Sequence, residues 1–152
     1  MEKVSSREWY NTVDHNLILG ALPLRWTTRE LVEKEHVRAV VSLNEDFELR
    51  YLANSSEEWH ALGVEYLHFN VIDMFEAPSQ NMLSEGVDFI DRNITADRIV
   101  YVHCKAGRSR SATLVSCYLM KKYNWTPEEA VSHLKAIRSH VILTEGKMEA
   151  LK

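Results

Sequence analysis

Short runs of β-branched and aliphatic residues alternate along the chain with stretches whose apolar positions recur at helical spacing. The apolar runs predict strands at residues 17–23, 37–43, 64–71 and 98–104. The intervening stretches predict helices at residues 28–36, 55–63, 80–95, 112–123 and 127–139. Strands that alternate with helices indicate an α/β fold, here a central, mostly parallel sheet of about four to five strands flanked by helices. No repeat or linker is visible, so we expect residues 1–152 to form a single domain.

Three of the predicted helices begin with the capping pattern S/T-x-x-E, in which the side chains of the first and fourth residues satisfy free backbone N–H groups. The pattern occurs at Thr27, Ser55 and Thr126, the last with Pro127 at the first helical position. In parallel α/β sheets, ligands bind beyond the carboxyl ends of the strands. Candidate chemistry is therefore sought in the segments that follow the predicted strands.

Composition excludes several classes of function. The net charge of −4 gives no reason to expect nucleic-acid binding, and no apolar run approaches the 18 residues of a membrane span. Two cysteines and no zinc-ligand spacing favour a reducing compartment and predict neither a metal nor another cofactor. The first residues, MEKVSSREWY, resemble no signal or transit peptide, and the final TEGKMEALK stops within a helical pattern, which favours a trimmed chain.

The segment HCKAGRSRS carries the strongest chemical signal. Cys104 ends a predicted strand, and an apolar helix follows after a short loop that contains Gly107. A glycine-containing loop that leads into a helix can aim its backbone N–H groups inward as an anion site. Arg110 can add a planar guanidinium that matches two oxygens of a phosphate. We expect the loop residues to bind a substrate phosphate; they are Lys105, Ala106, Gly107, Arg108, Ser109 and Arg110.

The same surroundings favour a reactive thiol. Cations and a helix N-terminus depress the pKa of a cysteine, so Cys104 is predicted to be a thiolate nucleophile that attacks phosphorus. Ser111 is placed to stabilise the sulfur by a hydrogen bond, and His103 to orient the loop rather than act as a base. A buried structural cysteine before a solvated basic loop is the alternative. The pattern H-C-x-x-G-x-x-R-S, matched at every position in a strand–loop–helix context, weighs against it.

This segment resembles the signature loop of the cysteine-dependent protein tyrosine phosphatase superfamily, in its compact dual-specificity branch. Together with LILGALPL and NWTPEEA, the resemblance extends over essentially the whole chain, to a mitochondrial member that dephosphorylates phosphatidylglycerophosphate in cardiolipin synthesis. It implies the compact dual-specificity phosphatase fold and an anionic phospholipid substrate at a membrane surface. It also implies a monomer on the matrix face of the mitochondrial inner membrane.

The leaving alkoxide needs a proton donor. Asp73 follows the strand at 64–71 and begins a loop, VIDMFEAP, that matches the acid loop of the family in its place upstream of Cys104. We therefore assign Asp73 as the general acid of the first step and the general base of the second. A turn or helix-capping aspartate is the alternative interpretation.

A second acidic loop, NEDFELR at 44–50, follows the strand at 37–43 and reaches the same edge. Its carboxylates could accept hydrogen bonds from substrate hydroxyls or steady Arg110. The resembling family has N-E-E-Y-E here, and this chain departs from it with Asp46 and Phe47. We favour Glu45 as the functional carboxylate of the loop; a solvated acidic turn is the alternative.

Three functions compete on these residues. They are a phosphatase acting on phosphatidylglycerophosphate, a dual-specificity phosphatase acting on phosphotyrosine, phosphoserine or phosphothreonine in proteins, and an inactive phosphate-binding module. An inactive module would usually lack Cys104, Arg110 or the acid, and all three are present. Lys105 and Arg108 favour a highly anionic substrate or membrane surface. The lipid substrate itself is implied by the resemblance and not by the residues.

Overall fold

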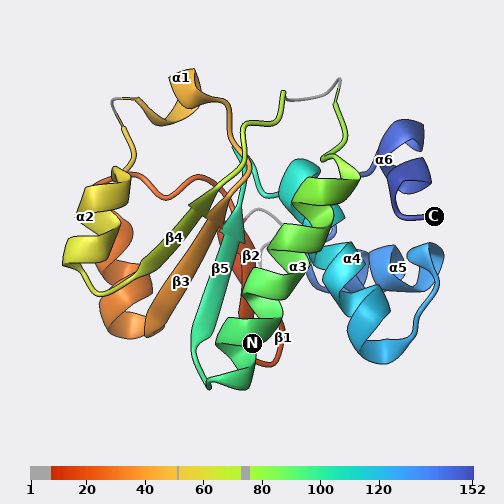
Figure 1. Ribbon diagram of the computed structural model, residues 1–152, viewed down its shortest axis with the longest axis horizontal. Helices are drawn as coiled ribbons and strands as arrows, with labels where there is room; N and C mark the ends of the chain where they lie inside the picture. The colour runs from red at the N-terminus through yellow and green to blue at the C-terminus, as the bar shows by residue number, and fades with distance from the viewer. Residues whose placement is uncertain (1–7, 51, 73–75) are drawn as a thin grey trace.

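The computed structural model describes residues 8–50, 52–72 and 76–152. Its centre is a five-stranded sheet in the order β1-β2-β5-β3-β4. The strands are β1 (Tyr10–Asp14), β2 (Leu17–Gly20), β3 (Val37–Ser42), β4 (Glu65–His68) and β5 (Ile99–His103). β1 runs antiparallel to β2, and every other neighbouring pair is parallel. The predicted α/β class and mostly parallel sheet are therefore confirmed (Figure 1).

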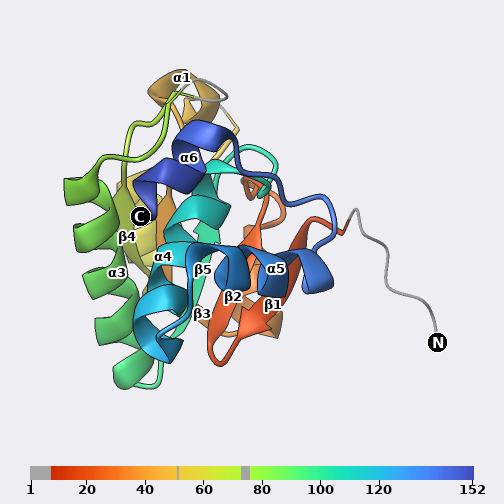
Figure 2. The same ribbon diagram turned by 90° about the vertical axis from the view of Figure 1, so that its right-hand side faces the viewer.

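Helices cover both faces of the sheet. They are a π-helix, η1 (Glu30–Lys34), and the α-helices α1 (Asp46–Leu49), α2 (Ser56–Ala61), α3 (Gln80–Thr95), α4 (Arg110–Tyr123), α5 (Pro127–Ile137) and α6 (Glu145–Ala150). Helices α3 and α4 pack on one face, with α5 against α4, while η1 and α2 pack on the other (Figures 1 and 2). The layers place α4 between the sheet and α5.

Burial on both faces explains the continuous apolar runs of the inner strands. Every residue of β2 is buried, and so are all residues of β3 except Arg38 and all residues of β5 except Ile99. The larger core cluster joins the sheet to α3, α4 and α5, and a smaller cluster around Trp59 joins it to η1 and α2. α4 is buried along most of its length, so the helix that follows Cys104 is anchored in the core.

Two local predictions differ from the structure. The edge strand β1 was not predicted, because only Val13 of its five residues is buried and its pattern lacks an apolar run. Thr27 directly precedes the helical residues Thr28 and Arg29, which lead into η1, but its hydroxyl donates to the carbonyl of Leu24 at 2.9 Å. The Glu30 N–H donates to the backbone carbonyl of Thr27 at 3.2 Å and not to its side chain. The caps at Ser55 and Thr126 are present as predicted.

The carboxyl ends of the four parallel strands meet at one edge of the sheet. His103 at the end of β5 pairs in register with Gly20 of β2 and with Ser42 of β3, and Ser42 pairs with His68 of β4. The loops that leave these strands therefore begin side by side, at the upper edge in Figure 1, where α1 also lies. The sequence predicts the site at this same edge.

Candidate active site

The segment 104–109, called the cysteine loop below, connects β5 to α4. Gly107 has a φ of +68°, in the left-handed region, and a Cβ at this position would collide with the backbone of Gly20. The loop therefore packs backbone to backbone against the end of β2, and Leu22 N–H donates to the Lys105 carbonyl at 3.1 Å. Only glycine combines this conformation with so close an approach.

The thiol of Cys104 is buried beneath this loop and has a hydrogen-bond partner. The residue is 3% exposed, and its Sγ lies 3.1 Å from Ser111 Oγ in the first turn of α4. Burial acts to raise the pKa of Cys104, but hydrogen bonds from the Ser111 side chain and backbone and the charge of Arg110 outweigh it. The net effect lowers the pKa below its ordinary value, as expected for a reactive cysteine.

His103 is buried against the same loop. Its Nδ1 lies 3.4 Å from the Cys104 carbonyl oxygen, so the ring can donate a hydrogen bond there. Burial lowers the pKa of His103 to about 3, so the ring is neutral near pH 7. This geometry is that of a side chain that supports the loop backbone.

Arg110, the first residue of α4, joins the start of that helix to the segments that follow β3 and β4. Its guanidinium is fully buried and forms a two-fold ion pair with Glu48, with Nη1–Oε1 and Nη2–Oε2 distances of 2.9 and 3.2 Å. Nη1 also donates to the Val71 carbonyl at 2.9 Å. The planar fork is therefore fixed in one orientation before any substrate enters.

The carboxylate of the acidic loop that reaches Arg110 belongs to Glu48 and not to Glu45, the residue favoured from the sequence. Glu45 is the N-cap residue of α1, and its backbone N–H donates to Glu48 Oε1 at 2.7 Å. The buried Asn44 donates to the same oxygen at 3.3 Å. Burial acts to raise the pKa of Glu48, but its hydrogen bonds and the Arg110 charge lower it overall.

A pocket of about 350 Å³ opens above Cys104. It is lined by Cys104, Lys105, Ala106, Arg108, Ser109, Arg110, Ile142 and Thr144. Sequence reasoning did not predict Ile142 and Thr144, which follow α5. Ile142 N–H donates to the Arg108 carbonyl at 2.8 Å, and Arg108 Nε donates to the His140 carbonyl at 3.0 Å. These bonds hold the segment after α5 beside the cysteine loop, where Ile142, 55% exposed, forms an apolar wall.

The predicted loop residues thus lie at one pocket. Five of the six line it, with Lys105, Ala106 and Arg108 exposed at its mouth, whereas Gly107 is buried against Gly20 and does not line it. Asp73, the predicted acid, lies outside the described residues, and its role stays a prediction. The segment between β4 and Asp73 passes beside the site, since the Val71 carbonyl accepts a hydrogen bond from Arg110.

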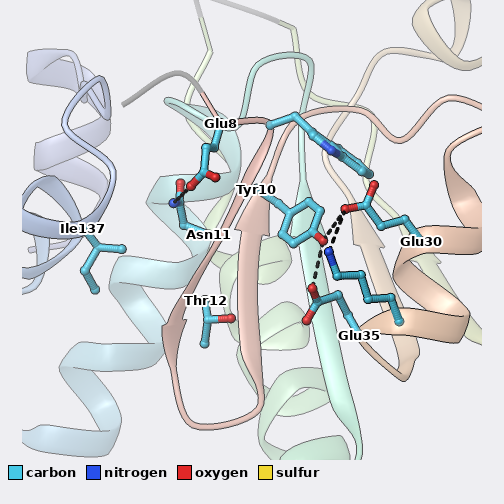
Figure 3. A pocket seen from close by; sticks show the side chains of 9 residues that line it. Glu8, Tyr10, Asn11, Thr12, Glu30, Glu35 and Ile137 are labelled. Atoms are coloured by element: carbon cyan, nitrogen blue, oxygen red, sulfur yellow. Dashed lines mark hydrogen bonds and ion pairs between the residues drawn. The ribbon is translucent and has the colours of Figure 1, made fainter. Parts of the chain in front are cut away.

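A second hollow lies away from this edge, beside β1 and η1 (Figure 3). There the Tyr10 hydroxyl lies between the carboxylates of Glu30 and Glu35, at 2.7 and 2.9 Å. Acidic walls do not suit a phosphate.

Within residues 8–50, 52–72 and 76–152, no group of three or more His, Cys, Asp or Glu side chains could hold a metal ion. Among the same residues, no helix is long and apolar enough to cross a membrane.

Comparisons with known proteins agree with this geometry. Phosphatidylglycerophosphatase and protein-tyrosine phosphatase 1 of Homo sapiens is 48% identical over 146 residues, which are 96% of this chain and 73% of that protein. Phosphatidylglycerophosphate phosphatase PTPMT1 of Arabidopsis thaliana is 35% identical over 97% of this chain and 42% of its own length. The crystal structure of PTPMT1 in complex with PI(5)P superposes with a TM-score of 0.93 at 46% identity, covering 95% of this chain and 93% of that one.

The family model for the dual specificity phosphatase catalytic domain matches residues 31–152. That span contains the cysteine loop, Arg110 and the acidic loop at 44–50. The chain therefore belongs to the dual-specificity phosphatase family of cysteine-dependent phosphatases.

Proposed function

We propose that this chain hydrolyses the terminal phosphate monoester of phosphatidylglycerophosphate and releases phosphatidylglycerol and inorganic phosphate. The observation that carries this proposal is the likeness along 96% of the chain to proteins named for that activity, combined with a pocket that has the thiol and guanidinium the chemistry needs. The same likeness supports a mitochondrial protein that works at a membrane surface, and we propose the matrix face of the inner membrane as its place.

In the first step, the phosphate enters the pocket with its non-bridging oxygens toward the backbone N–H groups of the cysteine loop and toward Arg110. The Cys104 sulfur attacks phosphorus, an S–P bond forms, and the bond from phosphorus to the glycerol oxygen breaks. Asp73 gives its proton to that oxygen, so the leaving group departs as an alcohol. The product on the protein is a phosphocysteine.

In the second step, water attacks the phosphorus of the phosphocysteine while Asp73, now a carboxylate, takes a proton from it. The S–P bond breaks and the electron pair returns to sulfur. The Ser111 hydroxyl, 3.1 Å from Sγ, stabilises the thiolate that leaves. The lowered pKa of Cys104 makes its thiolate a better leaving group as well as a more abundant nucleophile.

The mouth of the pocket fits a lipid with two phosphates. Lys105 and Arg108 are exposed there and can attract the phosphodiester next to the glycerol, while the exposed Ile142 offers an apolar wall toward the rest of the lipid. We propose these three residues as contacts of the lipid headgroup. The anionic substrate would then meet cations only locally, on a chain whose net charge is −4.

The second candidate function is protein phosphatase activity, which the names of the family and of the human relative include. The test measures kcat/KM for phosphatidylglycerophosphate in mixed micelles, for PI(5)P in the same micelles and for a phosphotyrosine peptide. We expect the first substrate to be preferred by at least about tenfold, a difference of about 1.4 kcal/mol in transition-state stabilisation. Comparable rates on lipid and peptide would reject the lipid assignment, and Cys104→Ser measures the background on each substrate.

A further inference from the structure

Arg138 is a second buried arginine beside the cysteine loop, and the phosphatase mechanism above does not use it. It is the C-cap residue of α5 and is 1% exposed. On one side, its Nε and Nη2 donate to the carbonyls of Gly107 and Ala106, both at 2.9 Å. On the other side, Nη1 donates to the Glu8 carbonyl and to Asn11 Oδ1, both at 2.7 Å.

We infer that Arg138 is a positioning residue that holds the cysteine loop in its anion-binding conformation. In a trans peptide, the carbonyl of one residue and the N–H of the next point in opposite directions. Carbonyls of Ala106 and Gly107 that are held on Arg138, behind the loop, therefore turn the N–H groups of Gly107 and Arg108 away from it. Those N–H groups then face the side from which a phosphate approaches, as an anion site requires.

The guanidinium is itself anchored from behind the loop. Asn11 lies on β1 beside Glu8 (Figure 3), and its amide nitrogen lies 3.4 Å from Glu8 Oε1 while its oxygen accepts from Arg138. This orients the amide with its oxygen toward the guanidinium. The Arg138 side chain thereby joins the end of α5 to the edge strand β1 and to the cysteine loop. Strand β1, which has few buried residues, is linked to the site in this way.

The charge of Arg138 is unusual for a buried group. Its acceptors are backbone carbonyls and a neutral amide, and burial lowers its pKa, against attraction from Tyr101 and Cys104. A buried cation is costly unless its donors are satisfied, and here they are. The same positive charge favours the thiolate of Cys104, so both its geometry and its charge act on the nucleophile and the anion site.

The experiment compares Arg138→Met, Arg138→Lys and Asn11→Ala with the wild-type chain. Arg138→Met removes the donors, Arg138→Lys keeps the charge without the planar fork, and Asn11→Ala removes an anchor while the arginine remains. Arg38→Met is the matched control, because Arg38 also donates to backbone carbonyls, those of Val32 and Val37, at the opposite end of β3.

Three readouts separate positioning from a purely structural role. They are kcat and KM for p-nitrophenyl phosphate, the inhibition constant of inorganic phosphate, and the pH dependence of Cys104 alkylation by iodoacetamide, followed on the Cys104 peptide by mass spectrometry. Circular dichroism and thermal unfolding report folding. The aryl phosphate makes this test independent of the lipid substrate, so it can fail or succeed apart from the proposed function.

We expect Arg138→Met to lower kcat/KM by about tenfold or more, to weaken phosphate inhibition by a similar factor, and to raise the apparent pKa of Cys104. Arg138→Lys should recover part of the thiol shift but little of the phosphate affinity, and Asn11→Ala should change every readout in the same direction by less. Arg38→Met should leave all three readouts within about twofold.

If Arg138→Met kept the wild-type phosphate affinity and thiol pKa and showed only a lower Tm, the inference would be overturned. Should Arg138→Met fail to fold, Arg138→Lys and Asn11→Ala decide on the same readouts: unchanged phosphate inhibition in both would also overturn it.

Discussion

The cysteine loop and the acidic loop at 44–50 lie at the same edge of the sheet, but they are held in different ways. The cysteine loop is fixed through its backbone, by the packing of Gly107 on Gly20 and by the hydrogen bonds of Arg138. The acidic loop reaches the site through one side chain, Glu48, which pairs with Arg110 across 62 residues of sequence. The cysteine loop binds the phosphate, and the acidic loop orients Arg110, the cation of the site.

The two loops also oppose each other electrostatically. The cysteine loop must attract an anion, whereas a carboxylate beside it repels one. Glu48 limits this cost because its charge is matched by Arg110 in a pair that is almost fully buried. Pairing with Glu48 weakens the attraction of Arg110 for phosphate, but it fixes the orientation of the guanidinium. Bidentate binding of a phosphate requires that fixed orientation.

The largest expected effect is the loss of kcat when the nucleophile of the cysteine loop is replaced. Cys104→Ser keeps a hydrogen-bonding atom of similar shape but loses the low-pKa thiolate, so kcat should fall by about 10⁴-fold or more. Binding of inorganic phosphate should remain, because the loop N–H groups and Arg110 are unchanged. Turnover and isothermal titration measure the two properties. Appreciable residual turnover would reject the covalent mechanism.

The next effect targets the cation that both loops share. Arg110→Lys replaces a planar fork, held by Glu48 and the Val71 carbonyl, with a point charge. We expect kcat/KM to fall by about 10³-fold, in the range seen when one transition-state donor is lost. Arg92→Lys on α3, which pairs with Glu65 at the surface, is the control. Equal, small losses in both variants would mean that charge alone is sufficient.

Asp73 belongs to neither loop, and its variant tests the remaining part of the mechanism. Asp73→Ala should lower kcat by about 10²-fold and remove the alkaline limb of the pH–rate profile, because the proton donor is gone. The acid limb, set by the lowered pKa of Cys104, should stay. A profile that keeps both limbs would assign the acid to another residue.

The comparison of the loops also shows what sequence could predict. The cysteine loop was predicted residue by residue, because its strand, glycine, arginine and helix are consecutive and each has a local physical reason. In the acidic loop, the sequence indicated the edge but not that Glu48 is the carboxylate that pairs with Arg110; a role of Glu45 toward substrate hydroxyls stays a prediction. Glu45 and Glu48 differ only in the turn of α1, and a turn of four helical residues decides which of them faces Arg110.

Contacts between distant segments account for the other differences. Ile142 enters the pocket only because the segment after α5 bonds to Arg108. Arg138, near the end of a predicted helix, gave no signal in the sequence that it would turn inward to Ala106 and Gly107. Strand β1 lies at the edge of the sheet and buries only Val13, so its sequence needs no apolar run. Such features depend on packing between segments far apart in sequence, which local patterns do not encode.

A smaller effect separates the two glutamates of the acidic loop. Glu48→Gln removes the charge that orients Arg110, so kcat should fall by about tenfold, whereas Glu45→Gln should stay within about twofold. The same substitution three residues away, at the N-cap of the same short helix, is a matched control. Steady-state kinetics on p-nitrophenyl phosphate checks both. A larger loss in Glu45→Gln would restore the choice made from the sequence and assign the substrate-facing role to Glu45.

The smallest effect is on stability in acid. A carboxyl group with a lowered pKa in the folded state stabilises that state above its unfolded pKa, near 4.5, and loses the contribution as the pH falls through the folded pKa. Glu48→Gln has no such titration. It should therefore be less stable than wild type at pH 7, by roughly 1 to 3 kcal/mol. The two unfolding free energies should converge as the pH is lowered from 5 toward 3.

Urea unfolding at a series of pH values measures this difference, with Glu45→Gln as the control that should follow the wild-type curve. The other acid-labile groups of the chain, including the buried His103, titrate in every variant and cancel in the comparison. Equal unfolding free energies for wild type and Glu48→Gln at every pH from 7 to 3 would show that the ion pair contributes nothing to folding. Glu48 would then orient Arg110 for catalysis without holding the two loops together.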